Sequence, residues 1–265
     1  MAETTRIGWT DKTWNPWYGC TKVSPGCAHC YMFRDREKKH LVADVVQRSK
    51  TTFRAPLRWK KPELVFTCSW SDFFHADADA WRDEAWEIIR QTPHLTYQIL
   101  TKRPERIAAC LPTDWGEGWP NVWLGVSVEN QRWMERAARL ARIPARIRFL
   151  SCEPLLGPVS FRWAEWDSFA KRDGSDGRNG RTDHLDGLRR WFHWVIAGGE
   201  SGPEAHPCDP DWLRTLRDQC AEAGVPYFLK QLGGHPDARA HEKAVLDGAC
   251  HAAMPPIFTS TGNQP

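Results

Sequence analysis

Short apolar, strand-like runs alternate with amphipathic, helix-like runs along most of the chain. The strand candidates are too apolar to expose one face to water, which is typical of strands covered on both sides. They lie at Leu64–Cys68, Thr96–Leu100, Val122–Val126, Ile147–Ser151, Trp194–Ala197 and Tyr227–Lys230, after a first short strand near Ile7–Thr13. Strands of this kind, separated by helices, predict a parallel sheet in an α/β protein.

The segments between the strands carry apolar residues at helical spacing. The helix candidates are Ala80–Thr92, Pro104–Leu111, Asn130–Ala141 and Asp211–Ala223. Six or seven strand–helix units predict a full or partial (β/α) barrel, TIM-like and with parallel strands, in a single domain over residues 1–234. An open doubly wound sheet is the alternative, although no Gly-x-Gly-x-x-Gly opens the first helix.

Two stretches depart from this alternation. Lys171–Arg190 is rich in glycine, aspartate and arginine and has almost no apolar residue, so we expect a mobile insertion in the barrel. His235–Pro265 has no clear period, and we expect an irregular C-terminal tail.

The chain contains 9 cysteines and no apolar run of membrane-spanning length. Its N-terminus is polar and lacks the apolar core of a signal peptide, so we expect a cytoplasmic protein with no membrane partner. In that compartment cysteines more often bind metal or do redox chemistry than form disulfides. The net charge of +3 permits a phosphate-binding surface without requiring one.

The strongest local signal is the spacing Cys20-x6-Cys27-x2-Cys30, here called the cysteine loop (residues 20–30). Turn-forming residues surround the first two cysteines, and we expect a helix to begin near Cys27. Three thiolates suit a soft metal centre. A [4Fe–4S] cluster would leave one iron open for another ligand, whereas zinc would take a fourth ligand from His29 or His40.

Polar side chains follow each of the six later strand candidates. Because parallel strands end at one edge of a sheet, we expect these side chains to surround the mouth of the barrel, on the same face as the cysteine loop. The chemically capable residues among them are Ser69, Asp72, Lys102, Arg103, Glu129, Glu153, Gly198, Gly199, Glu200 and Lys230. The glycines before Glu200 predict a close approach of a ligand to the backbone.

Three clustered cysteines after the first strand of such a barrel, ending Cys-x-x-Cys-Tyr, resemble the radical S-adenosylmethionine (SAM) enzymes, in particular the spore-photoproduct-lyase-like branch. The wider sequence resembles a family of phage and prophage proteins of uncharacterised function. This second resemblance extends over about residues 7–234 and includes Thr67-Cys-Ser-Trp-Ser-Asp, Ser151-Cys-Glu-Pro-Leu-Leu-Gly-Pro and Gly198-Gly-Glu-Ser-Gly.

The radical SAM pattern is matched with departures. Its usual spacing is Cys-x3-Cys-x2-Cys, whereas the first gap here is six residues. The aromatic residue that usually precedes the third cysteine is replaced by His29, and the Gly-Gly-Glu run, which usually follows an early strand, comes late at Gly198–Glu200.

The resemblance implies that Cys20, Cys27 and Cys30 hold a [4Fe–4S] cluster, whose open iron binds SAM for reductive cleavage and hydrogen abstraction from a substrate. It implies that SAM or substrate is held by Ser69, Asp72, Glu129, Gly198, Gly199, Glu200 and Glu153. Lys102, Arg103 and Lys230 would meet a phosphate or a carboxylate. A reductant protein such as flavodoxin or ferredoxin would supply electrons. The phage resemblance and the 16 tryptophans favour modification of a nucleic-acid base or nucleotide.

The sequence is also compatible with two other functions. One is an iron–sulfur or zinc nucleic-acid-binding protein without SAM chemistry, which the late Gly-Gly-Glu and the unusual cysteine spacing favour. The other is a metal-stapled structural or interaction protein of a phage. The acidic residues at the strand ends favour the enzyme, since a binding protein has no need of acids at a barrel mouth.

Overall fold

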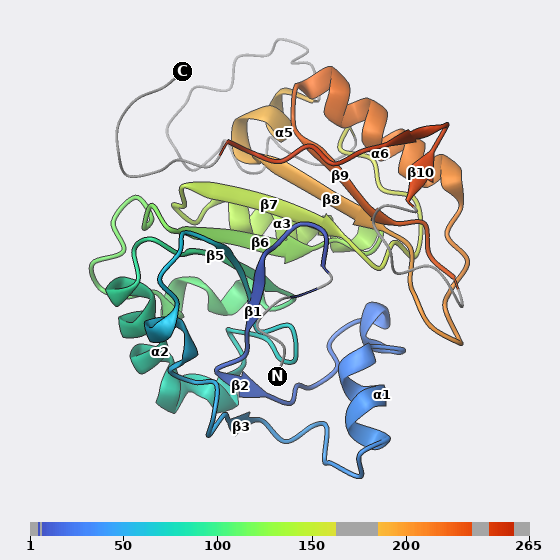
Figure 1. The fold of residues 1–265 in the computed structure, drawn as a ribbon. Helices are drawn as coiled ribbons and strands as arrows, with labels where there is room; N and C mark the ends of the chain where they lie inside the picture. The colour runs from blue at the N-terminus through green and yellow to red at the C-terminus, as the bar shows by residue number, and fades with distance from the viewer. Residues whose placement is uncertain (1–4, 6, 163–184, 235–243, 257–265) are drawn as a thin grey trace.

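Seven parallel strands form one sheet at the centre of the computed structural model, which describes residue 5 and residues 7–162, 185–234 and 244–256 (Figure 1). The strands are β1 (Lys12–Trp14), β4 (Leu64–Thr67), β5 (Thr96–Thr101), β6 (Val122–Ser127), β7 (Ile147–Cys152), β8 (Trp194–Gly198) and β9 (Tyr227–Gln231). They lie in the sheet in this same order, with β1 and β9 at the two ends of the series.

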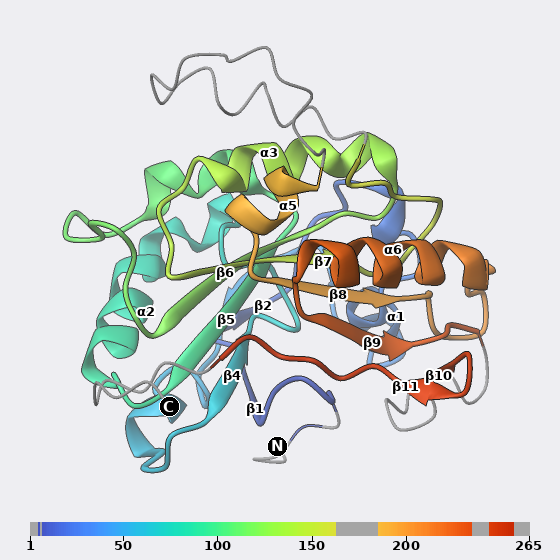
Figure 2. The ribbon, with the colours of Figure 1, turned by 90° about the horizontal axis from the view of Figure 1, so that it is seen from above.

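The order of the strands never reverses, as it would in a doubly wound sheet. Every neighbouring pair in the sheet is parallel, and the sheet curls into a half-barrel (Figures 1 and 2). The predicted α/β class, parallel strands and partial barrel are therefore confirmed. The doubly wound alternative does not apply.

Helices cover one face of this sheet. They are α2 (Asp79–Gln91), α3 (Met134–Ala141), α5 (Asp186–Trp191) and α6 (Pro210–Ala223), whereas α1 (Tyr31–Glu37) stands apart from this layer (Figures 1 and 2). In the part of the chain that the structure describes, no helix has the length and apolar character needed to cross a membrane.

Local sequence explains where α6 begins and ends. Asp209 caps its first turn, because the Asp209 carboxylate accepts a hydrogen bond of 2.9 Å from the backbone nitrogen of Asp211. Pro210 takes the first helical position, where its lack of an N–H costs nothing. Gly224 ends the helix with a φ of 67°, a conformation that favours glycine.

Aromatic side chains fill the other face of the sheet. Trp9, Trp123, Phe149, Trp194 and Phe228 are buried in one cluster that includes no helical residue. A side chain at Gly125 would overlap the ring of Phe149, so glycine is required there. These tryptophans fill a core and are not exposed stacking platforms.

Two expected helices need correction. Pro104–Leu111 is not one helix but two 3-10 turns, Pro104–Arg106 and Ala108–Cys110. The helix expected from Cys27 begins instead at Tyr31, after a 3-10 turn at Pro25–Cys27, because Cys30 has an extended ψ of 128°.

The boundaries of the expected insertion and tail also change. Residues 171–184 lie outside the described part of the chain, but residues 185–190 pack, since Leu185 and Leu188 are buried in the core. In the expected tail, Leu246 is buried, and Ala252 forms an antiparallel bridge with Phe228 of β9. The tail also contains a short ribbon of β10 (Val245–Leu246) and β11 (Ala249–Cys250).

Candidate functional site

The cysteine loop lies at the carboxyl end of the sheet. A short ribbon of β2 (Trp17–Tyr18) and β3 (Gln47–Arg48) leads into it. Gly19 then turns the chain with a φ of 94°, and a side chain at Gly19 would overlap the carbonyl of Val45. The backbone nitrogen of Cys20 donates to the carbonyl of Ala43 at 3.0 Å, which fixes the start of the loop.

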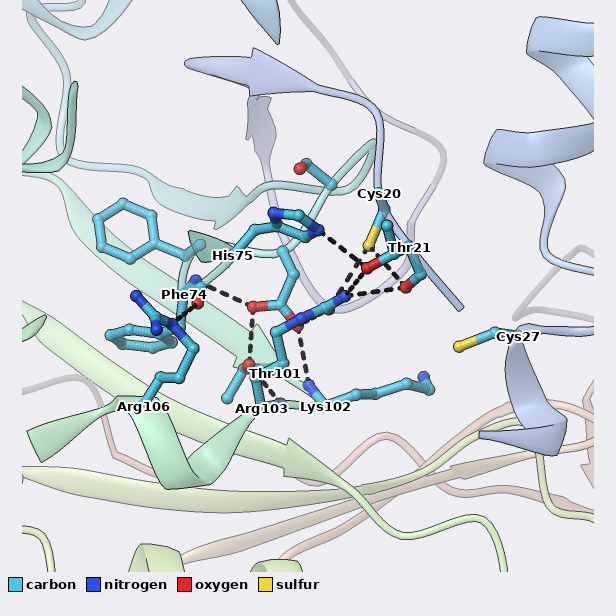
Figure 3. A network of polar contacts seen from close by, with 12 residues as sticks. Cys20, Thr21, Cys27, Phe74, His75, Thr101, Lys102, Arg103 and Arg106 are labelled. Atoms are coloured by element: carbon cyan, nitrogen blue, oxygen red, sulfur yellow. Dashed lines mark hydrogen bonds and ion pairs between the residues drawn. The ribbon is translucent and has the colours of Figure 1, made fainter. Parts of the chain in front are cut away.

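Cys20, Cys27 and Cys30 all line one cavity of about 450 Å³. Burial, with the carboxylate of Asp72 and the thiol of Cys27 as further causes, raises the pKa of the Cys20 thiol to about 12. Burial likewise raises the pKa of Cys30, and Cys27 again adds to the effect. Cys27 thus acts electrostatically on both other thiols. Figure 3 shows the Cys20 sulfur at a network of polar contacts and the Cys27 sulfur to one side of it.

Ten of the residues predicted from the sequence line this cavity. They are Cys20, Cys27, Cys30, Ser69, Asp72, Lys102, Arg103, Glu153, Glu200 and Lys230. Gly198, Gly199 and Glu129 are not among the lining residues. The cavity floor includes apolar side chains of Ile7, Trp9, Phe66 and Leu100, so the site has an apolar base and a polar, thiol-bearing rim.

Arg103 joins the cysteine loop to the sheet (Figure 3). Its Nη1 donates to Cys20 Sγ at 3.5 Å and to Asp72 Oδ2 at 3.1 Å, and its Nη2 donates to the carbonyl and hydroxyl of Thr21, both at 2.8 Å. Asp72 also accepts from the Thr101 hydroxyl at 2.7 Å and from the Lys102 backbone nitrogen at 3.0 Å. Both side chains are almost fully buried, so their contacts hold Cys20 in place.

Glu129 lies beneath the cysteine loop and is fully buried. The Ser24 hydroxyl donates to its Oε1 at 2.6 Å, and a side chain at Gly26 would lie 2.5 Å from the same oxygen. Arg136 and Lys102 each form an ion pair of 3.6 Å with this carboxylate. Glu129 thus supports the loop from below and does not face the cavity.

Lys230 and Glu153 form an ion pair on the cavity wall, from the ends of β9 and β7. Lys102 Nζ donates to the Ser127 hydroxyl at 3.1 Å. Ser69 exchanges hydrogen bonds with the side chain of Asn15. These groups are polar side chains of the kind expected at the strand ends. They line the cavity, where they would contact a bound molecule.

Gly198 and Gly199 serve a different purpose from the predicted one. A side chain at Gly199 would overlap the carbonyl of Leu232 and lie 2.9 Å from Gly233 Cα. The glycines therefore permit close packing of two backbone segments, and this packing accounts for them without a ligand. Glu200 follows them, is 7% exposed and lines the cavity.

Sequence reasoning missed several cavity residues. Cys68 is buried at the wall with a φ of 63°, and burial raises its pKa well above the usual thiol value. Tyr31 and Trp70 also line the cavity, as does His29, which the sequence offered only as a zinc ligand. Because Cys68 directly follows β4, its position at a strand end could have predicted that it lines the cavity. Cys152, a strand-end cysteine like Cys68, is instead fully buried in the core.

The thiol set is chemically suited to a metal cluster. The three cysteines of the loop, Cys20, Cys27 and Cys30, form no disulfide bonds, and all three line one cavity. Burial disfavours the thiolates of Cys20 and Cys30, and a bound cation would reverse that preference because coordinated thiols lose their protons. The Arg103 donor on Cys20 is the kind of outer contact that stabilises a ligating sulfur.

The fold and the site define an α/β protein whose curled parallel sheet carries a cysteine-lined cavity at its carboxyl edge. Residues 4–255 match the family model described as "Protein of unknown function (DUF5131)", so the chain belongs to this family. A search of curated proteins and a search of solved structures each found no match.

Proposed function

We propose that this protein is a radical-SAM-like [4Fe–4S] enzyme with a TIM-like partial barrel, and that it modifies a nucleic-acid base or nucleotide in a phage context. One observation carries the proposal: the three cysteines of the loop open onto one cavity together with charged side chains from the ends of five strands. Active sites of (β/α) barrels are built at this edge.

Cys20, Cys27 and Cys30 would hold the cluster, which leaves one iron without a protein ligand. Such a cluster supplies, when bound, the electron that breaks the sulfonium bond of SAM. A reductant protein such as flavodoxin or ferredoxin would deliver that electron.

The chain's own residues would bind, orient and enclose the reactants. Arg103 holds the loop through Cys20 and Thr21, and Glu129 supports it through Ser24. Lys230 offers a cation to a carboxylate or phosphate, and Glu153 offers acceptors to an ammonium or to ribose hydroxyls. The apolar floor excludes water from one side of the bound molecule.

A second candidate is an iron–sulfur or zinc nucleic-acid-binding protein without SAM chemistry. The packing of Gly199 against Leu232 and Gly233 favours it, because the only Gly-Gly-Glu run is then explained without SAM. The two candidates differ in one product, 5′-deoxyadenosine.

The deciding assay is formation of 5′-deoxyadenosine by anaerobically reconstituted protein with SAM and dithionite. We expect wild type to form it and Glu153→Gln to form about tenfold less at equal iron content, because hydrogen bonds to charged groups contribute about 1.5–3 kcal/mol. Glu204→Gln, an exposed acid outside the cavity, is the matched control and should behave as wild type. Fully loaded wild type that forms no 5′-deoxyadenosine would favour the second candidate.

A further inference from the structure

A histidine, a glutamate and a second histidine converge beside the cysteine loop. His29 lies between Cys27 and Cys30, Glu200 follows β8, and His206 lies six residues further on. His29 Nδ1 is 3.1 Å from Glu200 Oε2, and His206 Nδ1 is 3.7 Å from the same oxygen. One ligand atom from each residue lies within 4.8 Å of the others.

We propose that His29, Glu200 and His206 form a second metal site, which binds a divalent first-row transition-metal ion. The site would be separate from the cysteine ligands and does not depend on the proposed radical SAM function. Two imidazole nitrogens and one carboxylate are a donor set that suits Zn²⁺, Fe²⁺ and Co²⁺.

The spacing between Glu200 and each histidine fits an ion of this size. Bonds of about 2.0–2.2 Å in tetrahedral or octahedral geometry place neighbouring ligand atoms about 2.9–3.5 Å apart. The two distances from Glu200 Oε2 lie within a few tenths of an ångström of this range. The two imidazole rings are stacked with centroids 6.0 Å apart, and the Nδ1 atom of each faces the same carboxylate.

The buried charge of Glu200 also favours a bound cation. Its side chain is 7% exposed, yet within the described residues no lysine or arginine forms an ion pair with it. Its side-chain neighbours in these contacts are the two histidines, and the backbone nitrogen of His206 donates to Oε2 at 2.9 Å. A buried carboxylate without a full countercharge is costly, and a divalent cation would supply that charge. The backbone donor would orient the carboxylate toward the ion.

The cavity gives the ion a role. His29 and Glu200 both line the cavity, so an ion held there would be reached from it. Three protein ligands leave coordination positions open, as in catalytic metal sites. We infer that an oxygen ligand, from water or from a phosphate group of a molecule in the cavity, occupies them.

Cobalt binding tests this site directly. We would titrate Co²⁺ into the Cys20→Ser, Cys27→Ser, Cys30→Ser triple variant, in which the cysteine ligands are absent. We expect one equivalent to bind with visible d–d bands and without thiolate-to-cobalt charge transfer. Adding His206→Ala should weaken binding about 100-fold, because loss of even an outer contact costs 10–100-fold. His206 is 62% exposed, so its truncation should leave the fold intact.

His40→Asn is the matched control, since His40 is an exposed histidine with a φ of 55°, which asparagine tolerates. Equal affinity with and without His206 would overturn the proposal. If the triple variant does not fold, equilibrium dialysis of Zn²⁺ against cluster-loaded wild type and His206→Ala gives the same comparison, with one fewer equivalent expected in the variant. Metal binding without any iron–sulfur cluster would reject the proposed function and keep this site.

Discussion

Arg103 is the residue on which the geometry of the cysteine loop most depends. Its guanidinium contacts Cys20, Thr21 and Asp72 at once, and Asp72 is in turn bound to the end of β5. The sequence placed Arg103 at a strand end but indicated a substrate contact. The partner, Cys20, lies 83 residues earlier, and no local pattern reports a contact across that separation.

We predict that Arg103→Lys weakens retention of the cluster. A lysine keeps the charge beside Asp72, but its single ammonium does not reproduce the planar fork of donors to Cys20 and Thr21. We expect about tenfold faster loss of iron to a chelator, since outer contacts of metal ligands contribute 10–100-fold in affinity. Arg106→Lys is the control, because Arg106 pairs with Asp79 and does not contact the loop. Equal rates of iron loss in wild type and Arg103→Lys would show that the contact is incidental.

The cysteine loop behaves as an element supported from below by Glu129. The buried Arg136 and the half-buried Lys102 share this carboxylate, and Ser24 donates to it. Arg136 is 3% exposed, and burial lowers its pKa, so its charge needs the acid nearby. Sequence reasoning placed Glu129 in the ligand-binding set because its position after β6 resembles that of the other acids.

We predict that Glu129→Gln destabilises the fold and the loop together. Removing one partner of a buried ion pair costs about 3–5 kcal/mol, and the retained shape of glutamine sets the expected loss near the lower end, about 3 kcal/mol. The free energy of unfolding in urea gives the measurement. Glu135→Gln, an exposed acid on the same helix as Arg136, should change it by less than about 0.5 kcal/mol. If the Glu129→Gln variant is as stable as wild type but forms less 5′-deoxyadenosine, Glu129 binds SAM or substrate, as the sequence predicted, and is not a support of the loop.

At the element scale the strands were predictable and the short helices were not. The six later strands differ from the predicted ranges by one residue at their ends, because continuous apolar runs report burial on both faces directly. The segment after Pro104 carries apolar residues at helical spacing, but only Ile107 and Pro104 are buried, and it forms two turns. Periodicity alone does not distinguish a buried turn from a helix.

Across the whole molecule, the order of strands along the chain is the order in the sheet. This order brings the ends of β4 to β9 to one edge, so seven of the predicted residues line one cavity together with the three cysteines of the loop. The convergence follows from parallel topology, which the sequence indicates. The sequence does not show which acids face the cavity, because this depends on the direction in which each side chain points in the folded protein. His206 does not lie at the end of a strand, so the pattern of polar residues at strand ends could not predict its place in the site.

The stability of the whole fold should fall as the pH drops below about 6.5. Burial lowers the pKa of His193, with Arg148 as a further cause, and the His193 Nδ1 accepts from the Arg148 backbone nitrogen at 3.1 Å. The unfolded chain then binds the proton more readily than the folded chain. The contribution is present above the unfolded value of about 6.5 and is lost as pH falls toward the folded pKa, with a slope of at most about 1.4 kcal/mol per pH unit.

His193→Asn tests this dependence, since the amide oxygen can replace the Nδ1 acceptor without titrating. Between pH 7.5 and 5.5 the free energy of unfolding should fall less in the variant than in wild type. His75, whose pKa burial also lowers, contributes in the same direction in both proteins and leaves a residual slope. If the free energy of unfolding depends on pH with the same slope in both proteins, His193 does not contribute to the pH dependence.

Iron and sulfide analysis of the anaerobically reconstituted protein tests the central claim most directly. We expect about four iron and four sulfide per chain in wild type and in Cys250→Ser, whose cysteine is exposed and outside the cavity. Cys27→Ser should lose most of both, together with the visible absorption of the cluster. Iron and sulfide contents in Cys27→Ser equal to those of wild type, or a wild type that takes up zinc without sulfide, would contradict the assignment of Cys20, Cys27 and Cys30 as ligands of a [4Fe–4S] cluster.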